Sequence, residues 1–265
     1  MRILTNDGLP LTLRLARKIM MGLGLFLALS SCDSDNASKE EPNSLVKLKL
    51  MTDWYAEPEH GGFYLALIRG YYADAGIDLE ITPGNNFINI YQMVATGEIH
   101  IGLGTSDTML KHIGTGIPLV GLYPYFQHDP QGIMFHREQA IESFAELNGR
   151  DVMISPVLGY VEYLQNTLDI QMNLIPHDGS LARFIDDKSF IQQAFLTSEP
   201  YFVQQGGADP AVLPFWEMGY DPYRLAFSHR KVMEQYPQAI KGFIEASQRG
   251  WQEFMAGDTE DVYLY

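Results

Sequence analysis

The chain has 265 residues, of which 46% are hydrophobic and 19% are charged, a composition that supports a packed core and differs from that of a disordered tail. Lys and Arg number 18 and Asp and Glu number 33, giving a formal net charge of −15. A nucleic acid would therefore be repelled, and no such partner is expected. The single cysteine excludes a disulfide framework, a cysteine zinc cage and an iron–sulfur cluster, because each needs at least two cysteines.

The first 32 residues have the pattern of an export signal. Arg14, Arg17 and Lys18 precede an apolar run over 19–29, which is too short to cross a hydrocarbon core that needs about 20 helical residues. The run ends in the sequence LSSC over 29–32, which resembles the lipobox of bacterial lipoproteins. The resemblance implies a signal peptide over 1–31 and lipidation of Cys32. An ordinary secretory peptide with a chance cysteine, or a buried helix, are the alternatives.

A polar segment follows the lipobox. Apart from Pro42, residues 33–44 include no apolar side chain larger than alanine, so this stretch can bury almost nothing and is expected to be a flexible tether over 32–44. The folded body is expected to begin near Leu45. The protein is then exported and lipid-anchored to the cell membrane, facing the periplasm or the outer surface.

The first half of the folded body predicts strands that alternate with helices. The alternating sequence VKLKLM over 46–51 is typical of a strand with one buried face. The same criteria predict further strands over 77–81, 99–103 and 118–122, and helices from 61 to Gly76, over 88–97 and over 106–113, the last with Ser106 as a possible cap.

The alternation restarts after the aromatic stretch YPYF over 123–126. Strand-like segments lie at 132–135 and 151–154, helical ones at 141–147 and 160–168, and short apolar runs at 190–195 and 211–215. A long helical stretch over 231–255 is broken only near Pro237. The sequence therefore predicts an α/β protein of two units with mainly parallel sheets, each unit about 100 residues long.

Five segments together resemble one known family. They are TDWYAEPEHGGFYLA over 52–66, RGYYADAGIDL over 69–79, GLGTSD over 102–107, FLTSEPY over 195–201 and GYDPY over 219–223. In this order and spacing they resemble the NMT1/THI5-like family, which is named for the yeast thiamine-pyrimidine synthase and also contains bacterial solute-binding lipoproteins. The similarity covers residues 46–257.

The resemblance implies a periplasmic-binding-protein fold of type II, with two α/β lobes and a ligand held between them. Lobe 1 is expected over 45–122 and 225–265, and lobe 2 over 123–224. The chain stops earlier than is typical of the family.

The synthase branch of the family needs residues that this chain lacks. In that branch a lysine and a histidine stand four residues apart after the third strand, with iron and pyridoxal phosphate taking part, and the matching positions here are Gly104 and Thr108. A Schiff base needs an amine, and neither side chain supplies one. The cysteine-rich run of the synthases is also missing. We therefore expect a protein that is not an enzyme and needs no cofactor, with a pyrimidine-phosphate synthase as the alternative.

Candidate ligand-binding residues follow predicted strands or occupy aromatic loops, because ligands of open α/β sheets bind beyond the strands' carboxyl ends. Trp54 and Tyr55 could stack on a flat heterocycle or fill the core. Glu199, held extended before Pro200, could accept from a ligand amino group or be a loop charge. The full set is Trp54, Tyr55, His60, Asn85, Thr105, Ser106, Tyr125, Tyr160, Glu199, Tyr220 and Tyr223.

Several of these residues have a structural alternative. His60 could hydrogen-bond the ligand, or cap or pack against the first helix, and Asn85 could simply form a turn. His128, Asp129 and His136 match no metal-ligand spacing, so no metal site is predicted.

These patterns predict a substrate-binding lipoprotein of an ABC importer for a small aromatic nitrogen heterocycle, such as a thiamine pyrimidine precursor. The partners would be the ligand, the permease and the membrane, and the protein would be a monomer. Riboflavin, sulfonates, taurine and nitrate are alternative ligands within the family. The anionic ones would need a basic cleft, and no clustered arginine lies near the proposed loops.

Overall fold

The structure is a computed structural model that describes residues 44–85, 88–257, 259–260 and 262–264. The predicted signal peptide, the lipidation site at Cys32 and all of the tether except Ser44 lie outside the described residues. Within the described part of the chain, no helix combines the length and the apolar character needed to span a membrane.

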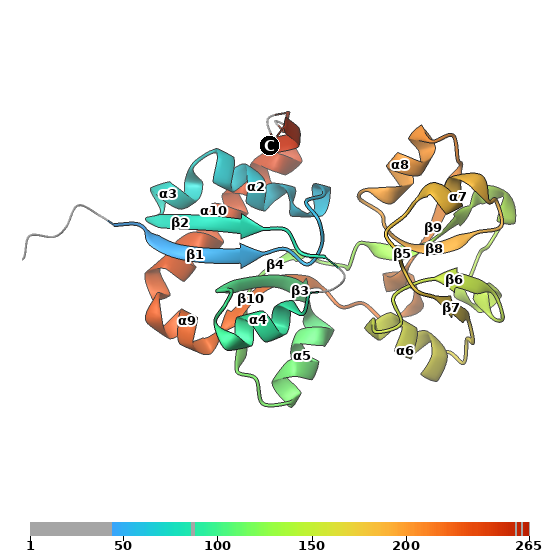
Figure 1. The fold of residues 1–265 in the computed structure, drawn as a ribbon, viewed down its shortest axis with the longest axis horizontal. Coiled ribbons are helices and arrows are strands. Elements are labelled where there is room, and N and C mark those ends of the chain that lie inside the picture. The colour runs from blue at the N-terminus through green and yellow to red at the C-terminus, as the bar shows by residue number, and fades with distance from the viewer. Residues whose placement is uncertain (1–43, 86–87, 258, 261, 265) are drawn as a thin grey trace, which may run out of the picture. The chain divides into compact units, whose positions relative to one another are not determined.

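The first of two sheets is built mainly from the N-terminal half of the chain (Figure 1). Its order is β2-β1-β3-β10-β4, with β1, β2 and β3 parallel and β10 antiparallel to both of its neighbours. The strands are β1 (Val46–Met51), β2 (Ile77–Thr82), β3 (Ile101–Thr105), β4 (Leu119–Phe126) and β10 (Arg224–His229). The helical elements beside them are η1 (Pro58–His60), α2 (Gly61–Ile68), α3 (Tyr71–Asp74), α4 (Ile90–Thr96), α5 (Ser106–Gly114), α9 (Arg230–Gln235), α10 (Pro237–Ala256) and η5 (Val262–Leu264). We call this sheet with its helices the first lobe.

Helices pack on both faces of the first sheet, and β1 contributes side chains to the apolar core on each face. Leu48 and Leu50 point into a core shared with α2, α3 and α10, whereas Met51 joins a second core with α4 and α5. Lys47 and Lys49 alternate with the leucines and are exposed. The predicted strand and its buried face are thus confirmed.

The second sheet has the order β7-β6-β8-β5-β9 and mixes parallel and antiparallel pairs. Its strands are β5 (Gln131–His136), β6 (Asp151–Met153), β7 (Asn173–Ile175), β8 (Ile191–Phe195) and β9 (Pro210–Pro214). Its helical elements are η2 (Arg137–Gln139), η3 (Phe144–Leu147), α6 (Gly159–Asn166), α7 (Ala182–Asp186), α8 (Glu199–Gln205) and η4 (Phe215–Met218). Two apolar cores, one on each side, pack against this sheet. This sheet with its helices is the second lobe.

The chain passes between the two sheets twice, over 127–130 and over 219–223. The first passage begins four residues later than the sequence indicated, because β4 continues to Phe126 instead of ending at Leu122. The extension pairs with β10, and Phe126 stands opposite Arg224. Since β4 is an edge strand with irregular register, it accommodates Pro124.

The C-terminal helical stretch divides at the proline that the sequence indicated. α9 ends at Gln235, and α10 begins with Pro237, a position where a missing N–H costs nothing.

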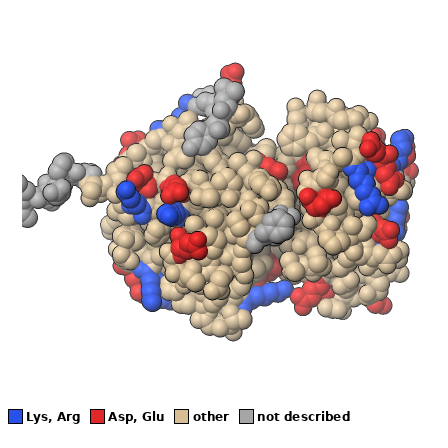
Figure 2. All heavy atoms as spheres, in the orientation of Figure 1, with Lys and Arg blue, Asp and Glu red and all other residues tan. Residues whose placement is uncertain are grey.

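On the face of the molecule drawn in Figure 2, acidic and basic side chains are scattered among uncharged ones without a large basic patch.

Candidate functional site

Polar residues from three strands meet at one edge of the first sheet, the edge formed by the carboxyl ends of β1 and β3. β1 and β3 are parallel and end at this edge, where Asp53 follows β1 and Ser106 follows β3. β10 runs the other way and begins here with Arg224. Residues far apart in the sequence therefore meet at the place where open α/β sheets hold their ligands.

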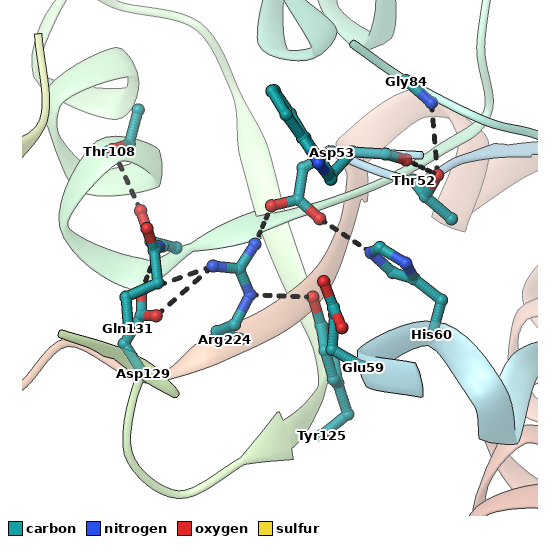
Figure 3. Close-up of polar contacts among 12 residues, drawn as sticks. Thr52, Asp53, Glu59, His60, Gly84, Thr108, Tyr125, Asp129, Gln131 and Arg224 are labelled. Carbon is teal, nitrogen blue, oxygen red and sulfur yellow. Dashed lines mark hydrogen bonds and ion pairs between the residues drawn. The ribbon is translucent and has the colours of Figure 1, made fainter. Parts of the chain in front are cut away.

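Arg224 is the centre of this cluster (Figure 3). It is only 1% exposed, forms an ion pair with Asp53 and lies 3.4 Å from Asp129 Oδ2 through Nη1. Its Nε donates to Tyr125 Oη at 3.3 Å, and its guanidinium lies 5.0 Å from the ring centroid of Phe195 in the second lobe. Burial lowers the pKa of Arg224 to about 9, so the side chain remains charged at neutral pH.

The two passages between the lobes are tied to each other. Asp129 belongs to the first passage, and Arg224 directly follows the second, so their ion pair joins the two segments. A second pair links His128 Nδ1 of the first passage to Asp221 Oδ2 of the second at 2.5 Å. Both links lie where the chain changes from one sheet to the other.

A chain of polar side chains continues from Asp129 into the second lobe. Tyr160 Oη donates to Asp129 Oδ2 at 3.3 Å, and Gln131 Nε2 donates to Tyr160 Oη at 2.5 Å. The Gln131 carbonyl accepts from the amide of Gln193, whose own carbonyl accepts from the Ser155 N–H at 3.2 Å. Burial raises the pKa of Asp129 to about 7. We call this hydrogen-bonded network, which consists of Asp129, Tyr160, Gln131, Gln193 and Ser155, the ladder. It begins beside Arg224.

Trp54 faces the second lobe from the end of β1. Its ring makes edge-to-face contacts with Tyr55, at 5.4 Å between centroids, and with His177 of the second lobe, at 6.2 Å. A Cβ added to Gly179 would lie 3.9 Å from Trp54 Cζ2. Trp54 is partly buried, whereas Tyr55 is 54% exposed. The indole thus reaches the loop of the second lobe between β7 and α7.

His60 supports the segment that bears Trp54. Its side chain is fully buried, which lowers its pKa to about 4 and keeps the ring neutral. Nε2 lies 3.2 Å from Asp53 Oδ1, and because a carboxylate only accepts, we assign the proton of the neutral ring to Nε2. His60 precedes α2, but its side chain makes no capping bond. It holds Asp53, which is the neighbour of Trp54.

A second contact between the lobes involves two glutamates. Thr197 Oγ1 donates to Glu59 Oε2 at 3.1 Å, and Ser198 Oγ donates to Glu57 Oε2 at 2.8 Å. Burial raises the pKa of Glu59 to about 9, and the negative charge of Glu57 acts in the same direction. Glu59 is therefore protonated at neutral pH, which allows two carboxyl groups to lie together at this contact.

The raised pKa of Glu59 predicts a pH-dependent stability. The folded state holds this proton more tightly than the unfolded chain, whose glutamate has the ordinary pKa of 4.5. The free energy of unfolding should therefore fall as the pH rises from 4.5 towards 9. Asp129 adds the same sign up to about 7, whereas His60 below about 6.5 and Arg224 near pH 9 add the opposite sign, because burial lowers their pKa values. The contribution of Glu59 is therefore measured as the difference between the unmodified protein and a Glu59 variant in urea titrations at each pH.

Glu59→Gln should remove most of this slope, because glutamine imitates the protonated carboxyl and does not titrate. The matched control is Glu245→Gln, at a surface glutamate that is 63% exposed, and it should keep the slope. An equal slope in Glu59→Gln and the unmodified protein would contradict the assignment.

Glu199 differs from its predicted conformation. Instead of lying in an extended loop before Pro200, it is the first residue of α8. Its Oε2 accepts from the Phe195 N–H at 2.8 Å and lies 2.6 Å from Ser198 Oγ, whose one proton serves either this oxygen or Glu57 Oε2. The extended assignment was wrong because proline is tolerated in the first turn of a helix, where an acidic residue also complements the helix dipole.

The polar candidates at the end of β3 are held by the second passage and by α4. Ser106 donates its N–H to the Tyr223 carbonyl at 3.0 Å, and its Oγ accepts from the Tyr223 N–H at 3.2 Å. Thr105, not Ser106, is the N-cap residue of α5, and it makes no side-chain cap bond to the helix backbone. Thr105 exchanges hydrogen bonds with Tyr91 Oη. Asn85 is partly buried, and its carbonyl accepts from Ile88 N–H.

Some of the candidate tyrosines pack in the apolar cores, and others lie where the chain passes between the lobes. Tyr125 packs against Trp251 in the first lobe, and Tyr160 stacks on Phe215 in the second, with ring centroids 4.1 Å apart. Tyr220 Oη donates to Asp107 Oδ2 at 2.7 Å. The Tyr223 side chain is 43% exposed. The hydroxyls of Tyr125, Tyr160 and Tyr220 thus meet the charged cluster, and their rings serve packing.

The sequence did not identify the charged members of the site. Arg224, Asp107 and Gln131 were not among the candidates, and Asp129 was considered only as a metal ligand. Within the part of the chain that the structure describes, no group of three or more His, Cys, Asp or Glu side chains is arranged to hold a metal ion. A charged residue opening a short apolar strand, as in RLAF over 224–227, was the available signal.

The two mixed sheets joined by two passages define a periplasmic-binding-protein fold of type II. A solved protein of Bordetella bronchiseptica is 13% identical with a TM-score of 0.63, covering 83% of this chain and 80% of that one. The aliphatic sulphonate binding protein SsuA of Escherichia coli is 14% identical with a TM-score of 0.59, covering 83% and 82%. The chain belongs to the NMT1/THI5-like family, whose model matches residues 57–260.

Relatives with curated names come from both branches of this family. A formylaminopyrimidine-binding protein of Halalkalibacterium halodurans is 30% identical over 135 residues, which are 51% of this chain and 40% of that protein. A 4-amino-5-hydroxymethyl-2-methylpyrimidine phosphate synthase of Candida albicans is 27% identical over 240 residues, which are 82% of this chain and 70% of the synthase. The match to the binding protein thus spans less than half of that relative.

Proposed function

We propose that this protein is the solute-binding component of an ABC importer and captures a small aromatic nitrogen heterocycle of the pyrimidine type. The observation that carries the proposal is the position of Trp54, whose indole reaches from the first lobe to His177 of the second. A flat ring can be held there by stacking. The hydrogen-bonded ladder that runs from Asp129 through Gln131 makes the neighbourhood of Arg224 polar.

The name of the Halalkalibacterium relative supports the same ligand class. A thiamine pyrimidine precursor is the specific ligand that we propose. Lipidation of Cys32 would keep the receptor close to its permease, and a single lipid chain gives only a marginal anchor, so a second acyl group would be needed for stable attachment. We propose that the protein acts as a monomer facing the periplasm or the outer surface.

Sulfonates and nitrate fit the site less well. Arg224 is the cation at this edge of the sheet, and it already contacts Asp53 and Asp129. An anionic ligand would have to displace one carboxylate from the guanidinium and remain near the other, at a cost in electrostatic energy. A neutral or amino-bearing ring meets no such penalty.

The synthase alternative lacks space as well as functional groups. A side chain at Gly104, where the synthases carry their lysine, would overlap the hydroxyl of Tyr91. Thr108 stands where they carry the histidine, and its hydroxyl accepts from Thr105 Oγ1 at 3.0 Å. The residues present therefore do not fit a lysine-bound pyridoxal phosphate. Production of a pyrimidine on incubation with iron and pyridoxal phosphate would favour the synthase.

The proposal is tested by thermal unfolding of the purified protein with pyrimidines, thiamine, riboflavin, sulfonates and nitrate. A ligand that binds only the folded state raises the unfolding temperature, by an amount corresponding to about 2.7 kcal/mol at 100 times its Kd. We expect a shift with an aminopyrimidine and none with nitrate or sulfonates. Trp54→Ala should abolish most of the shift without lowering the unfolding temperature of the free protein by a similar amount. A shift with sulfonates alone would contradict the proposal.

A further inference from the structure

One carboxylate oxygen of Asp107 accepts a hydrogen bond, and the other has no hydrogen-bond partner among the described residues. Oδ2 accepts from Tyr220 Oη at 2.7 Å. Oδ1 is buried and has no hydrogen-bond partner among the described residues. A buried acceptor is normally paired, and each exception calls for an explanation. A hydrogen-bond donor that arrives with a ligand is one such explanation.

Asp107 lies where the two lobes meet. It belongs to the first turn of α5, directly after β3, and the first residue of α6 in the second lobe packs against it. That residue is Gly159, and a Cβ added there would overlap both Tyr220 Oη and Asp107 Oδ2. The same two helices are joined by Lys111 Nζ and Glu162 Oε2, 3.0 Å apart. The Asp107 carboxylate therefore lies at the contact between the two lobes.

The surroundings of this carboxylate are negative and polar. The charge of Asp107 contributes to the raised pKa of Asp129 and of Tyr160, which places it within electrostatic range of the ladder in the second lobe. It also contributes to the raised pKa of Tyr220. An ionised carboxylate is an acceptor only. A ligand group that faces Asp107 must therefore donate a hydrogen bond.

We infer that Asp107 determines ligand specificity, its Oδ1 accepting a hydrogen bond from an exocyclic amino group on the bound heterocycle. This inference rests on the proposed function and adds Asp107 to Glu199 as a candidate acceptor. The contacts of Glu199 with Phe195 N–H and Ser198 Oγ both involve its Oε2. An amino group at that position donates, whereas a carbonyl oxygen would face the carboxylate with a second acceptor. The site should thus select amino-substituted over oxo-substituted pyrimidines.

Calorimetric titration with two probes tests the inference. They are 4-amino-5-hydroxymethyl-2-methylpyrimidine and the analogue in which a carbonyl oxygen replaces the 4-amino group. We expect the unmodified protein to bind the amino compound at least about tenfold more tightly. Asp107→Asn should weaken binding of the amino compound by about 10- to 100-fold and reduce the ratio between the probes, because a charged acceptor becomes a neutral amide.

Asp209→Asn is the matched control, since Asp209 lies at the start of β9 with a side chain that is 71% exposed. It should leave both affinities unchanged. If Asp107→Asn binds both probes as the unmodified protein does, the inference is overturned and the proposed function stands. If the unmodified protein binds neither probe, both are overturned. Equal affinity of the unmodified protein for the two probes overturns the inference without any variant.

Discussion

Replacing Arg224 with methionine is expected to lower the free energy of unfolding by about 3–5 kcal/mol, the usual cost of removing one partner from a buried ion pair. Methionine matches much of the side chain's length but leaves Asp53 without its cation. Asp129 loses the same cation, while Tyr125 Oη loses a donor. Urea unfolding at neutral pH measures the change.

Arg224→Lys separates the charge from the geometry. Lysine keeps the positive charge, but a single ammonium cannot reach two carboxylates and a hydroxyl as a planar guanidinium does. We expect an intermediate loss of stability. Arg137→Met is the control, because Arg137 forms a surface pair with Asp209 and is 62% exposed, and its replacement should cost at most about 1 kcal/mol. Equal costs for Arg224→Met and Arg137→Met would contradict the central role of Arg224.

Gly84→Ala should disturb the segment that carries Trp54. Gly84 N–H donates to the Trp54 carbonyl at 3.1 Å, and a Cβ added to Gly84 would overlap the backbone oxygen of Thr52. A backbone atom cannot rotate away as a side chain can, so the loop has to move. We expect a loss of about 1–3 kcal/mol in unfolding free energy, together with weaker binding of the aminopyrimidine in calorimetry.

Gly114→Ala is the matched control for this substitution. Gly114 ends α5, and a Cβ added there meets no atom within 4 Å. Alanine should be neutral or stabilise the helix by about 0.5–1 kcal/mol. If Gly84→Ala is as stable as Gly114→Ala, then the close approach at Thr52 does not constrain the loop.

The sequence predicted those elements whose burial pattern is local. β1 has alternating leucines, and β2 alternates in the same way before Pro83. The break between α9 and α10 follows from Pro237. By contrast, β10 was not predicted, because six residues with a charge at one end and a histidine at the other carry no clear period. Its strand character comes from pairing with β3 and β4, which are remote in the chain.

The sequence predicted only those members of the candidate site whose position depends on a local pattern. Trp54 was found because it directly follows a recognisable strand. Arg224 was not, since its environment depends on Asp53 and Asp129, which lie 171 and 95 positions earlier in the sequence. A single sequence does not indicate which distant charges will share a buried site. The extended conformation predicted for Glu199 depended on a local rule for residues before proline, and the start of α8 overrode that rule.

The double link between the passages restricts how the lobes can move. Arg224 with Asp129, and His128 with Asp221, fasten two backbone segments side by side. While both links hold, we expect the two segments to bend together, so that opening rotates one lobe about an axis that the two segments share. A connection of this kind would favour hinge rotation over twisting of one lobe against the other, and Trp54 would then meet the same loop each time the lobes close.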